Sequence, residues 1–189
     1  MHRFRFVAAA VVLLSIILAP TLVAELNWKE RLSDYETRLK RATSDEERFM
    51  LLPATANSAF QFGDLERARA YAEESLQLAE RYRNSWNYGN ALHHGHLLRG
   101  HSALQRGDIE RASNELLIAG DTPGSPQLDS FGPNMALAKA LLERGQRQPV
   151  LMYLEKCRKF WEMGGQRLDQ WKAEIEKGDI PDFGANLVY

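Results

Sequence analysis

The sequence has little of what disulfide, metal-cluster or nucleic-acid chemistry requires. It contains one cysteine, Cys157, which excludes an internal disulfide and any site built from several thiolates. Its 24 Lys and Arg residues are balanced by 25 Asp and Glu, and a net charge of −1 provides no basic surface for phosphate backbones. Hydrophobic residues make up 44% and charged residues 26% of 189 residues, which excludes wholesale disorder and is typical of one globular domain.

Catalytic motifs are also missing. There is no Gly-x-Ser-x-Gly nucleophile motif, no phosphate-binding loop and no dinucleotide fingerprint. Adjacent carboxylates such as Glu46-Glu47 and Glu73-Glu74 lie among basic residues, as on solvent-exposed helix faces. We therefore expect a protein that is not an enzyme and that has no cofactor.

One long hydrophobic run is present, at the N-terminus. Arg3 and Arg5 precede the apolar run Val7–Ala19, and Ala24 offers a small residue for cleavage. This order is typical of a secretory signal, so residues 1–24 are predicted to be a signal peptide or a membrane anchor. The remainder of the chain is then expected to be exported, to the periplasm or another extracytoplasmic compartment.

Whether this segment is removed stays open at the level of sequence. Residues 7–24 approach the lower length limit of a membrane span and would then serve as a tether. Cleavage would instead remove two arginines and leave 22 basic against 25 acidic residues, a net charge of −3.

Helical spacing recurs from Leu26 to the C-terminus, and no long stretch alternates apolar and polar residues. The first helix is predicted over residues 26–42, with apolar residues at i, i+4, i+7 and i+11: Trp28, Leu32, Tyr35 and Leu39. Ser44 and Glu47 form a capping-box pattern, which predicts the start of a second helix.

An internal repeat is visible in this helical region. The hexapeptide Gly63–Ala68 (Gly-Asp-Leu-Glu-Arg-Ala) recurs at 107–112 as Gly-Asp-Ile-Glu-Arg-Ala, and more weakly at 145–150. Each glycine follows a small residue by seven positions, at Ala56, Gly100 and Ala138. Small residues allow two helices to cross closely, and glycine allows a left-handed turn, so each copy predicts a helical hairpin.

These features resemble the tetratricopeptide repeat (TPR), a helix–turn–helix unit of about 34 residues. The middle copy carries the resemblance best, through Gly100, Gly107, Asp108, Ala112, Leu116 and Ala119. It departs from the family pattern at His96 and Ala103, where Trp and Tyr are common. The resemblance implies an all-α fold of antiparallel hairpins stacked as a short solenoid, with a capping helix at each end.

The expected organisation follows from these signals. The helical domain spans residues 25–180, with units at about 45–82, 87–120 and 133–162 and a C-terminal capping helix at about 166–177. Residues 120–133 are too rich in Pro and Gly for a helix and are expected to form a mobile insertion. Cys157 is expected in the core. The apolar tail 181–189 is expected either to dock on the last hairpin or to be a recognition segment itself.

In the repeat family, the first helices of successive units line a concave groove for a peptide or a partner's helix. Transferring the register gives these groove positions: Asn57, Phe60, Gln61, His94, Leu97, His101, Gln105, Met135 and Lys139. The resemblance thus implies a non-enzymatic scaffold that binds a protein or peptide. The N-terminal segment predicts that it acts at the cell envelope, and the balanced charge argues against a nucleic-acid partner. Phe60 and Leu97 are equally compatible with the hairpin core.

A histidine cluster offers an alternative function. His93, His94, His96 and His101 lie within nine residues, which is compatible with packing, with a metal-dependent protein or enzyme, or with a pH-sensing groove. The sequence itself names no metal ligand set, because no carboxylate lies among them. In the pH-sensing alternative, partner binding changes between about pH 5.5 and 7.5, where an ordinary histidine titrates.

Overall fold

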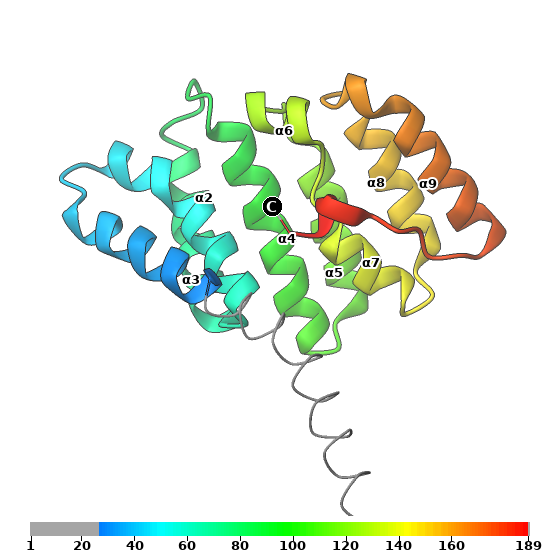
Figure 1. Cartoon of the computed structure of the whole chain (residues 1–189), viewed down its shortest axis with the longest axis horizontal. Helices are drawn as coiled ribbons and strands as arrows, with labels where there is room; N and C mark the ends of the chain where they lie inside the picture. Colours follow the sequence, from blue (N-terminus) through cyan, green and yellow to red (C-terminus); the bar gives the residue numbers. More distant parts are fainter. Residues whose placement is uncertain (1–26, 189) are drawn as a thin grey trace, which may run out of the picture.

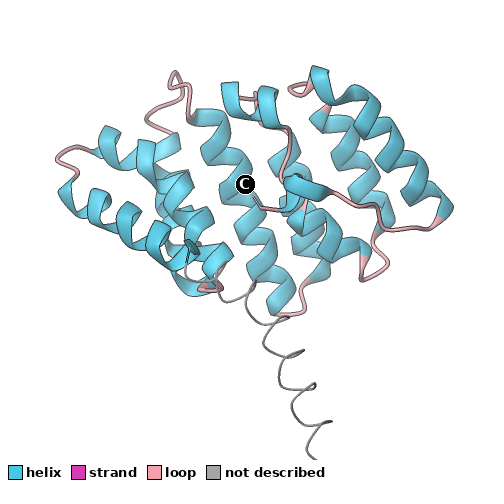
Figure 2. Cartoon of the chain, in the orientation of Figure 1, coloured by secondary structure: helices cyan, strands magenta, loops and turns pink. Residues whose placement is uncertain are grey.

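The computed structural model describes residues 27–188, so the predicted signal peptide or anchor lies outside the described residues. A first helix spans residues 27–41 and is followed by eight further α-helices (Figures 1 and 2). Their bounds are α2 Asp45–Phe62, α3 Leu65–Ala79, α4 Tyr88–Gln105, α5 Ile109–Gly120, α6 Pro126–Phe131, α7 Ala136–Leu142, α8 Arg147–Cys157 and α9 Gly165–Lys177. Short 3-10 turns occupy Glu162–Gly164 and Gly184–Leu187. No strand occurs among residues 27–188. The predicted all-α class is confirmed.

The helices pack as neighbouring antiparallel pairs. α2 packs on α3 and α4 on α5, while α3 also packs against α4 and α5 against α8. Figure 1 shows the pairs side by side along the long axis, with the helix 27–41 at one end and α9 at the other. This is the predicted arrangement of stacked hairpins with capping helices. The third pair departs from it, because α7 is short and α5 packs directly on α8.

The repeated hexapeptides form the turns between paired helices. Gly63, Gly107 and Gly145 have φ angles of 91°, 78° and 76°, the left-handed region that glycine enters without strain. Asp64 and Asp108 then cap the following helix, and each side chain accepts a hydrogen bond of 3.0 Å from a backbone N–H three residues later. The repeat therefore encodes a helix stop and a helix start.

The small residues that precede these turns are buried where helices meet. Ala56 and Ala138 are 1% and 0% exposed. At Gly100, a Cβ atom would lie 2.2 Å from Cδ2 of Leu137 on α7. The predicted need for small residues is confirmed, although at Gly100 the nearest neighbour belongs to the next hairpin.

The capping box at Ser44 forms in part. Its hydroxyl accepts a hydrogen bond from the backbone N–H of Glu47 at 3.2 Å. In a complete capping box the Glu47 carboxylate would accept from the backbone N–H of Ser44. Here it accepts instead from the backbone N–H of the preceding residue, Thr43, at 2.7 Å. The backbone N–H of Thr43, and next its hydroxyl at 3.1 Å, donate to this carboxylate and lower the pKa of Glu47.

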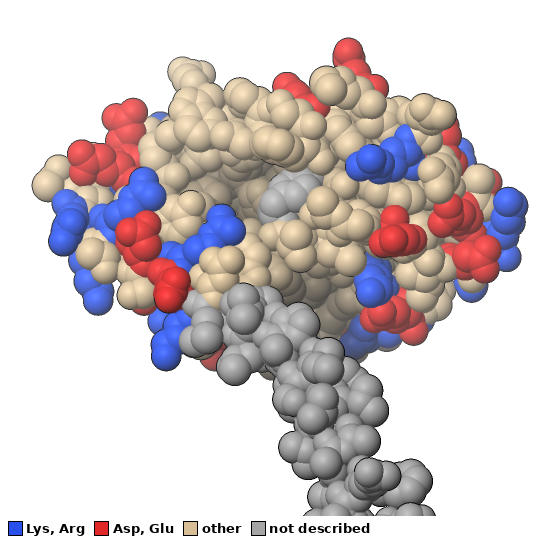
Figure 3. All heavy atoms as spheres, in the orientation of Figure 1, with Lys and Arg blue, Asp and Glu red and all other residues tan. Residues whose placement is uncertain are grey.

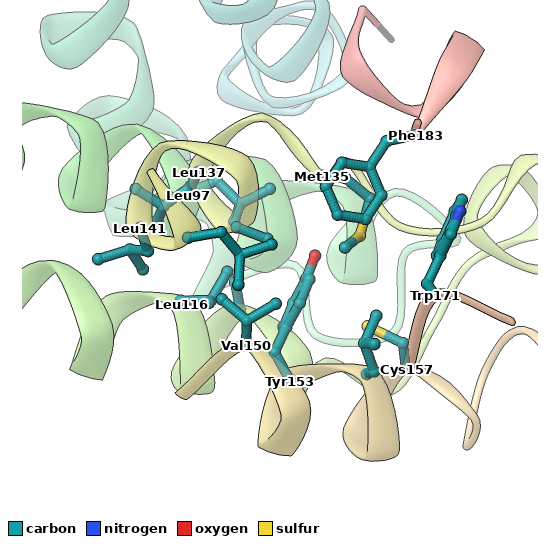
Figure 4. Close-up of a cluster of buried hydrophobic side chains, with 14 of the residues drawn as sticks. Leu97, Leu116, Met135, Leu137, Leu141, Val150, Tyr153, Cys157, Trp171 and Phe183 are labelled. Carbon is teal, nitrogen blue, oxygen red and sulfur yellow. The ribbon is translucent and has the colours of Figure 1, made fainter. Parts of the chain in front are cut away.

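The largest buried cluster lies between α5, α7, α8 and α9 (Figure 4). Tyr153, Trp171 and Phe183 converge in it, and the Phe183 ring meets the Trp171 ring edge-on at 5.1 Å. Cys157 lies in the same cluster with no exposed surface, as predicted, and burial raises the pKa of its thiol well above the usual value. A buried neutral thiol of this kind is not a nucleophile.

The segment 120–133 was predicted to be non-helical, and this prediction is wrong. It contains α6, whose N-cap is Ser125 and whose first residue is Pro126, a position where the missing N–H costs nothing. Leu128 is 1% exposed, and the Thr122 hydroxyl donates a 2.9 Å hydrogen bond to the carbonyl of Gly89. The prolines and glycines shape a packed connection here.

Candidate functional site

A groove of about 510 Å³ lies on one face of the helix row. Figure 3 shows a hollow on this face with few charged side chains around it. The groove is lined by residues of the helix 27–41, α2, the α3–α4 connection, α4, α6 and the tail: Trp28, Arg31, Met50, Pro53, Ala54, Asn57, Trp86, Asn87, Asn90, His94, Gln127, Phe131 and Val188. We call the face that carries it the concave face.

Large apolar side chains stand exposed around this groove. Trp86, Phe131 and Val188 are 51%, 61% and 46% exposed. Arg31 is the one charged residue of the lining, and its guanidinium lies over the Trp28 ring at 4.6 Å from the centroid. Exposed apolar surface around a hollow is typical of a binding site, because association removes it from water.

The amides on one side of the groove are fixed by hydrogen bonds. Asn90 donates to the side-chain oxygens of Asn87 and Gln127, both at 3.0 Å, and accepts from the Ser125 hydroxyl at 2.6 Å. Asn87 in turn donates to the carbonyl of Phe49 at 3.1 Å. This network joins α4 to α6 and holds that wall of the groove in one conformation.

Two of the nine predicted groove residues, Asn57 and His94, line this groove. Both are half-buried. Neither side chain has a hydrogen-bond partner among residues 27–188, so both are available to a ligand. The structure thus brings together two of the residues that the repeat register had assigned to a groove.

Three further predicted residues lie close by in a crevice too narrow for a ligand. Phe60, Leu97 and His101 join Asn57 and His94 around a space of about 10 Å³. The Phe60 ring packs on the His101 ring with centroids 4.4 Å apart, and Leu97 is 3% exposed in the main core. A space of this size holds at most one water molecule. These residues support the groove from beneath.

The remaining four predicted residues do not line the groove. Met135 is fully buried in the core, and Gln105 is exposed at the end of α4. Lys139 lies 4.0 Å from Glu143 on its own helix, and Gln61 bonds to the tail. The structure therefore does not bring these four residues together with Asn57 and His94. The tail covers the third unit, and the groove is formed by the first two units with the capping helix and α6.

Several lining residues were missed by sequence reasoning. Trp28 had been assigned only to the inner face of the capping helix, and nothing marked Trp86, Phe131 or Val188 as neighbours. They lie on four segments up to 160 residues apart, which only the folded chain brings together. An apolar residue beside Ser, Gly and Asn turn residues, as at Trp86 and Phe131, was the one local signal.

The histidine cluster does not converge. His93 points into the core, where Nδ1 lies 3.1 Å from the carbonyl of Ala119 and Nε2 accepts a hydrogen bond from the backbone N–H of Asn134 at 3.1 Å. His96 instead lies 2.7 Å from the Glu115 carboxylate. Within residues 27–188, no three His, Cys, Asp or Glu side chains lie close enough to hold a metal. Residues 27–188 therefore contain no group of side chains that could form the metal site of this alternative.

The pH-sensing alternative is not supported either. Burial lowers the pKa of His94 and His101 to about 4 and that of His93 to about 3. The expectation of a charge change between about pH 5.5 and 7.5 assumed an ordinary histidine and is wrong for these side chains. They are neutral throughout that range.

Comparison with known proteins identifies no relative of this chain. No family model matches the chain, and no curated protein or solved structure is significantly similar to it. The described helices define an all-α, repeat-like arrangement. No helix among residues 27–188 is both long and apolar enough to cross a membrane.

Proposed function

We propose that this protein is a non-enzymatic scaffold of the tetratricopeptide-repeat type that binds a segment of a partner protein. The observation that carries the proposal is the concave-face groove, with exposed Trp86, Phe131 and Val188 around Asn57 and His94. Aromatic anchors and side-chain amides are the groups that recognise peptides in preformed grooves.

The chemistry of the lining favours binding over catalysis. Burial lowers the pKa of His94 in this lining to about 4, which keeps the ring neutral near pH 7. A general acid or base works best with a pKa near the working pH, which His94 does not have. Asn57 and the neutral His94 ring instead offer hydrogen bonds to a peptide backbone.

We propose further that the protein acts at the cell envelope, exported or anchored through residues 1–24. The support is the order of Arg3, Arg5, the apolar run and Ala24 in the sequence. Fractionation of cells with N-terminal sequencing of the recovered protein tests this. A cytoplasmic protein that retains its N-terminus would contradict export, and an intact N-terminus in the membrane fraction would support the anchored form.

Selection from a random peptide library, followed by titration of the selected synthetic peptides, tests the binding function. Trp86→Ala and Asn57→Ala should each weaken the affinity about tenfold, which corresponds to one lost anchor or hydrogen bond. Ile118→Ala is the matched control, because Ile118 is 46% exposed on α5 and lies outside the groove. Failure to select any peptide, or equal losses in all three variants, would refute the proposed site.

A further inference from the structure

The C-terminal tail runs back from α9 towards α4 across the helix row (Figure 1), and Val188 near its end lines the groove. It is anchored as far as Asn186, which is 2% exposed. The Asn186 side chain donates to the carbonyls of Phe131 and Pro133 at 3.1 and 2.9 Å, and its own carbonyl accepts from the backbone N–H of Met135 at 2.7 Å. This is the third-unit surface that the repeat register had assigned to the groove.

Beyond Asn186, Leu187 packs partly buried against the main core, and the Val188 N–H donates a hydrogen bond to the carbonyl of Ala185 at 3.2 Å. The Leu187 carbonyl accepts one hydrogen bond, from Nε2 of Gln61 on α2, at 3.3 Å. Val188 is 46% exposed and forms part of the groove lining. The chain therefore leaves a buried anchor, crosses towards α2 and reaches the groove itself. Predicted docking of the tail is confirmed, and it extends well past the last hairpin.

These contacts show what kind of segment this face accepts. Backbone carbonyls of the tail are received by a side-chain amide and a main-chain N–H, and the residues that reach the groove are uncharged. The groove lining contains one charge, on Arg31, which is stacked on Trp28. A basic ligand side chain would lose water in this groove without gaining an opposite charge, whereas an apolar one would gain from burial. An acidic side chain could reach only Arg31.

We infer that the groove binds an uncharged, apolar peptide segment of the same chemistry as the tail, and that the tail after Asn186 occupies one end of that binding surface. Ligand binding along the whole surface then requires Leu187 and Val188 to move away from α2. This inference rests on the proposed function and specifies its ligand and its internal competitor.

The test uses the full chain and a synthetic probe, acetyl-Asn-Leu-Val-Tyr-amide, which repeats the last four residues without terminal charges. Binding is followed by NMR titration of the tryptophan indole N–H signals, since Trp28 and Trp86 line the groove. A chain truncated after Asn186 should bind the probe about tenfold more tightly than the full chain, because it lacks the competing residues. A probe with Asp in place of Leu and Val should bind neither the full chain nor the truncated chain.

A second variant separates competition from damage to the fold. Gln61→Ala removes the hydrogen bond to Leu187 without changing the tail, and should strengthen probe binding about threefold, between the full and truncated chains. Gln105→Ala is the matched control, since Gln105 is exposed at the C-terminal end of α4 and lies outside the groove. It should leave the affinity unchanged.

Each outcome bears on the inference separately from the proposed function. Equal probe affinity of full and truncated chains, with no change in Gln61→Ala, would refute the competition. Tighter binding of the Asp probe, or no binding of the neutral probe to the truncated chain, would refute the ligand class. If library selection still yields peptides that depend on Trp86, the groove stands and only its ligand was misidentified. If selection yields none, the proposed function falls as well.

Discussion

The N-terminal hairpin and the C-terminal helices are held together by different side chains. One of the buried clusters between α2 and α3 is made mainly of alanines, which are at most 1% exposed: Ala56, Ala59, Ala68 and Ala72. The C-terminal cluster is built instead from large rings, including Tyr153, Trp161, Trp171 and Phe183. Alanines let α2 and α3 approach closely but bury little apolar area, whereas the rings bury much more.

The narrow contact in the N-terminal half brings charged side chains of neighbouring helices within reach. Arg48 on α2 lies 2.6 Å from Glu74 on α3, and Arg67 lies 2.8 Å from Glu36 on the first helix. The Tyr71 hydroxyl also donates to Glu36 at 2.8 Å, and burial together with this carboxylate raises the pKa of Tyr71 to about 12. Polar contacts thus supplement the alanine contact in this half. The C-terminal half also has ion pairs, such as Lys172 with Glu155 at 2.9 Å, but beside a larger apolar cluster.

The groove lies between these two regions. Its walls combine Trp28 and Met50 from the N-terminal side with Phe131 and Val188 from the C-terminal side, on either side of α4. The difference between the halves therefore predicts where substitutions destabilise the protein most and which of them leave the groove intact.

The largest effect is expected in the aromatic cluster. Trp171→Ala should lower the free energy of unfolding by about 3–5 kcal/mol, because Trp171 is 3% exposed and its ring packs on Trp161 and Phe183. Chemical denaturation measures this. Tyr71→Phe in the N-terminal half should cost only about 1 kcal/mol, the value of one hydrogen bond. Similar losses in both variants would contradict the contrast between the two halves.

Acid should act through His93 and, to a similar extent, through His94 and His101, because burial lowers the pKa of all three. The pKa of His93 is about 3 in the folded chain and an ordinary 6.5 when unfolded, so the unfolded state binds the proton first as pH falls. The contribution of His93 to stability is unchanged above pH 6.5 and decreases below it, by roughly 2–3 kcal/mol near pH 4.5. His93→Gln should be less stable at pH 7 but show a shallower decrease between pH 6.5 and 4.5 in denaturant titrations. Parallel curves would mean that His93 does not carry the effect.

A moderate effect is expected where α4 meets α7. Gly100→Ala places a Cβ atom 2.2 Å from Leu137, so the Leu137 side chain must shift, at a cost of roughly 1–3 kcal/mol. Gly165→Ala is the control, because its backbone is helical and no atom lies within 4 Å of the added Cβ. That variant should be neutral or slightly stabilising in thermal unfolding. A neutral Gly100→Ala would show that this contact is loosely packed.

The smallest effect is expected from the ion pairs of the N-terminal hairpin. A double-mutant cycle with Arg48→Ala and Glu74→Ala should give a coupling energy of up to about 1 kcal/mol, because both side chains are about one-third exposed. The coupling should decrease as salt is raised from low to molar concentration. A larger, salt-independent coupling would indicate that these pairs, rather than the alanines, hold α2 on α3.

Local signals predicted most of the fold. The Gly-Asp turns, the small residues at 56, 100 and 138, and the apolar spacing of α9 each involve residues within one or two helical turns, and each was confirmed. The segment containing α6 was mispredicted because its Pro and Gly content was counted without their positions. A proline at the first residue of a helix and a serine before it favour a helix.

The candidate site was predicted only in part. Asn57 and His94 follow from the repeat register, which fixes where a residue lies along its own helix. Met135 was misplaced because its exposure depends on the tail, which lies about 50 residues further along the chain and bonds to its backbone. The shift of the histidine pKa values likewise depends on burial by other helices and is invisible in a run of histidines.

The sequence by itself determined that residues 27–188 form paired helices joined by glycine turns, because turn and cap chemistry acts over a few residues. The tertiary structure decided which surface stays open. That choice depends on a tail packed against Trp171 and α2, and on a connection folded into α6, contacts between segments distant in the chain. Long-range packing of this kind, rather than any local pattern, set the position and lining of the groove.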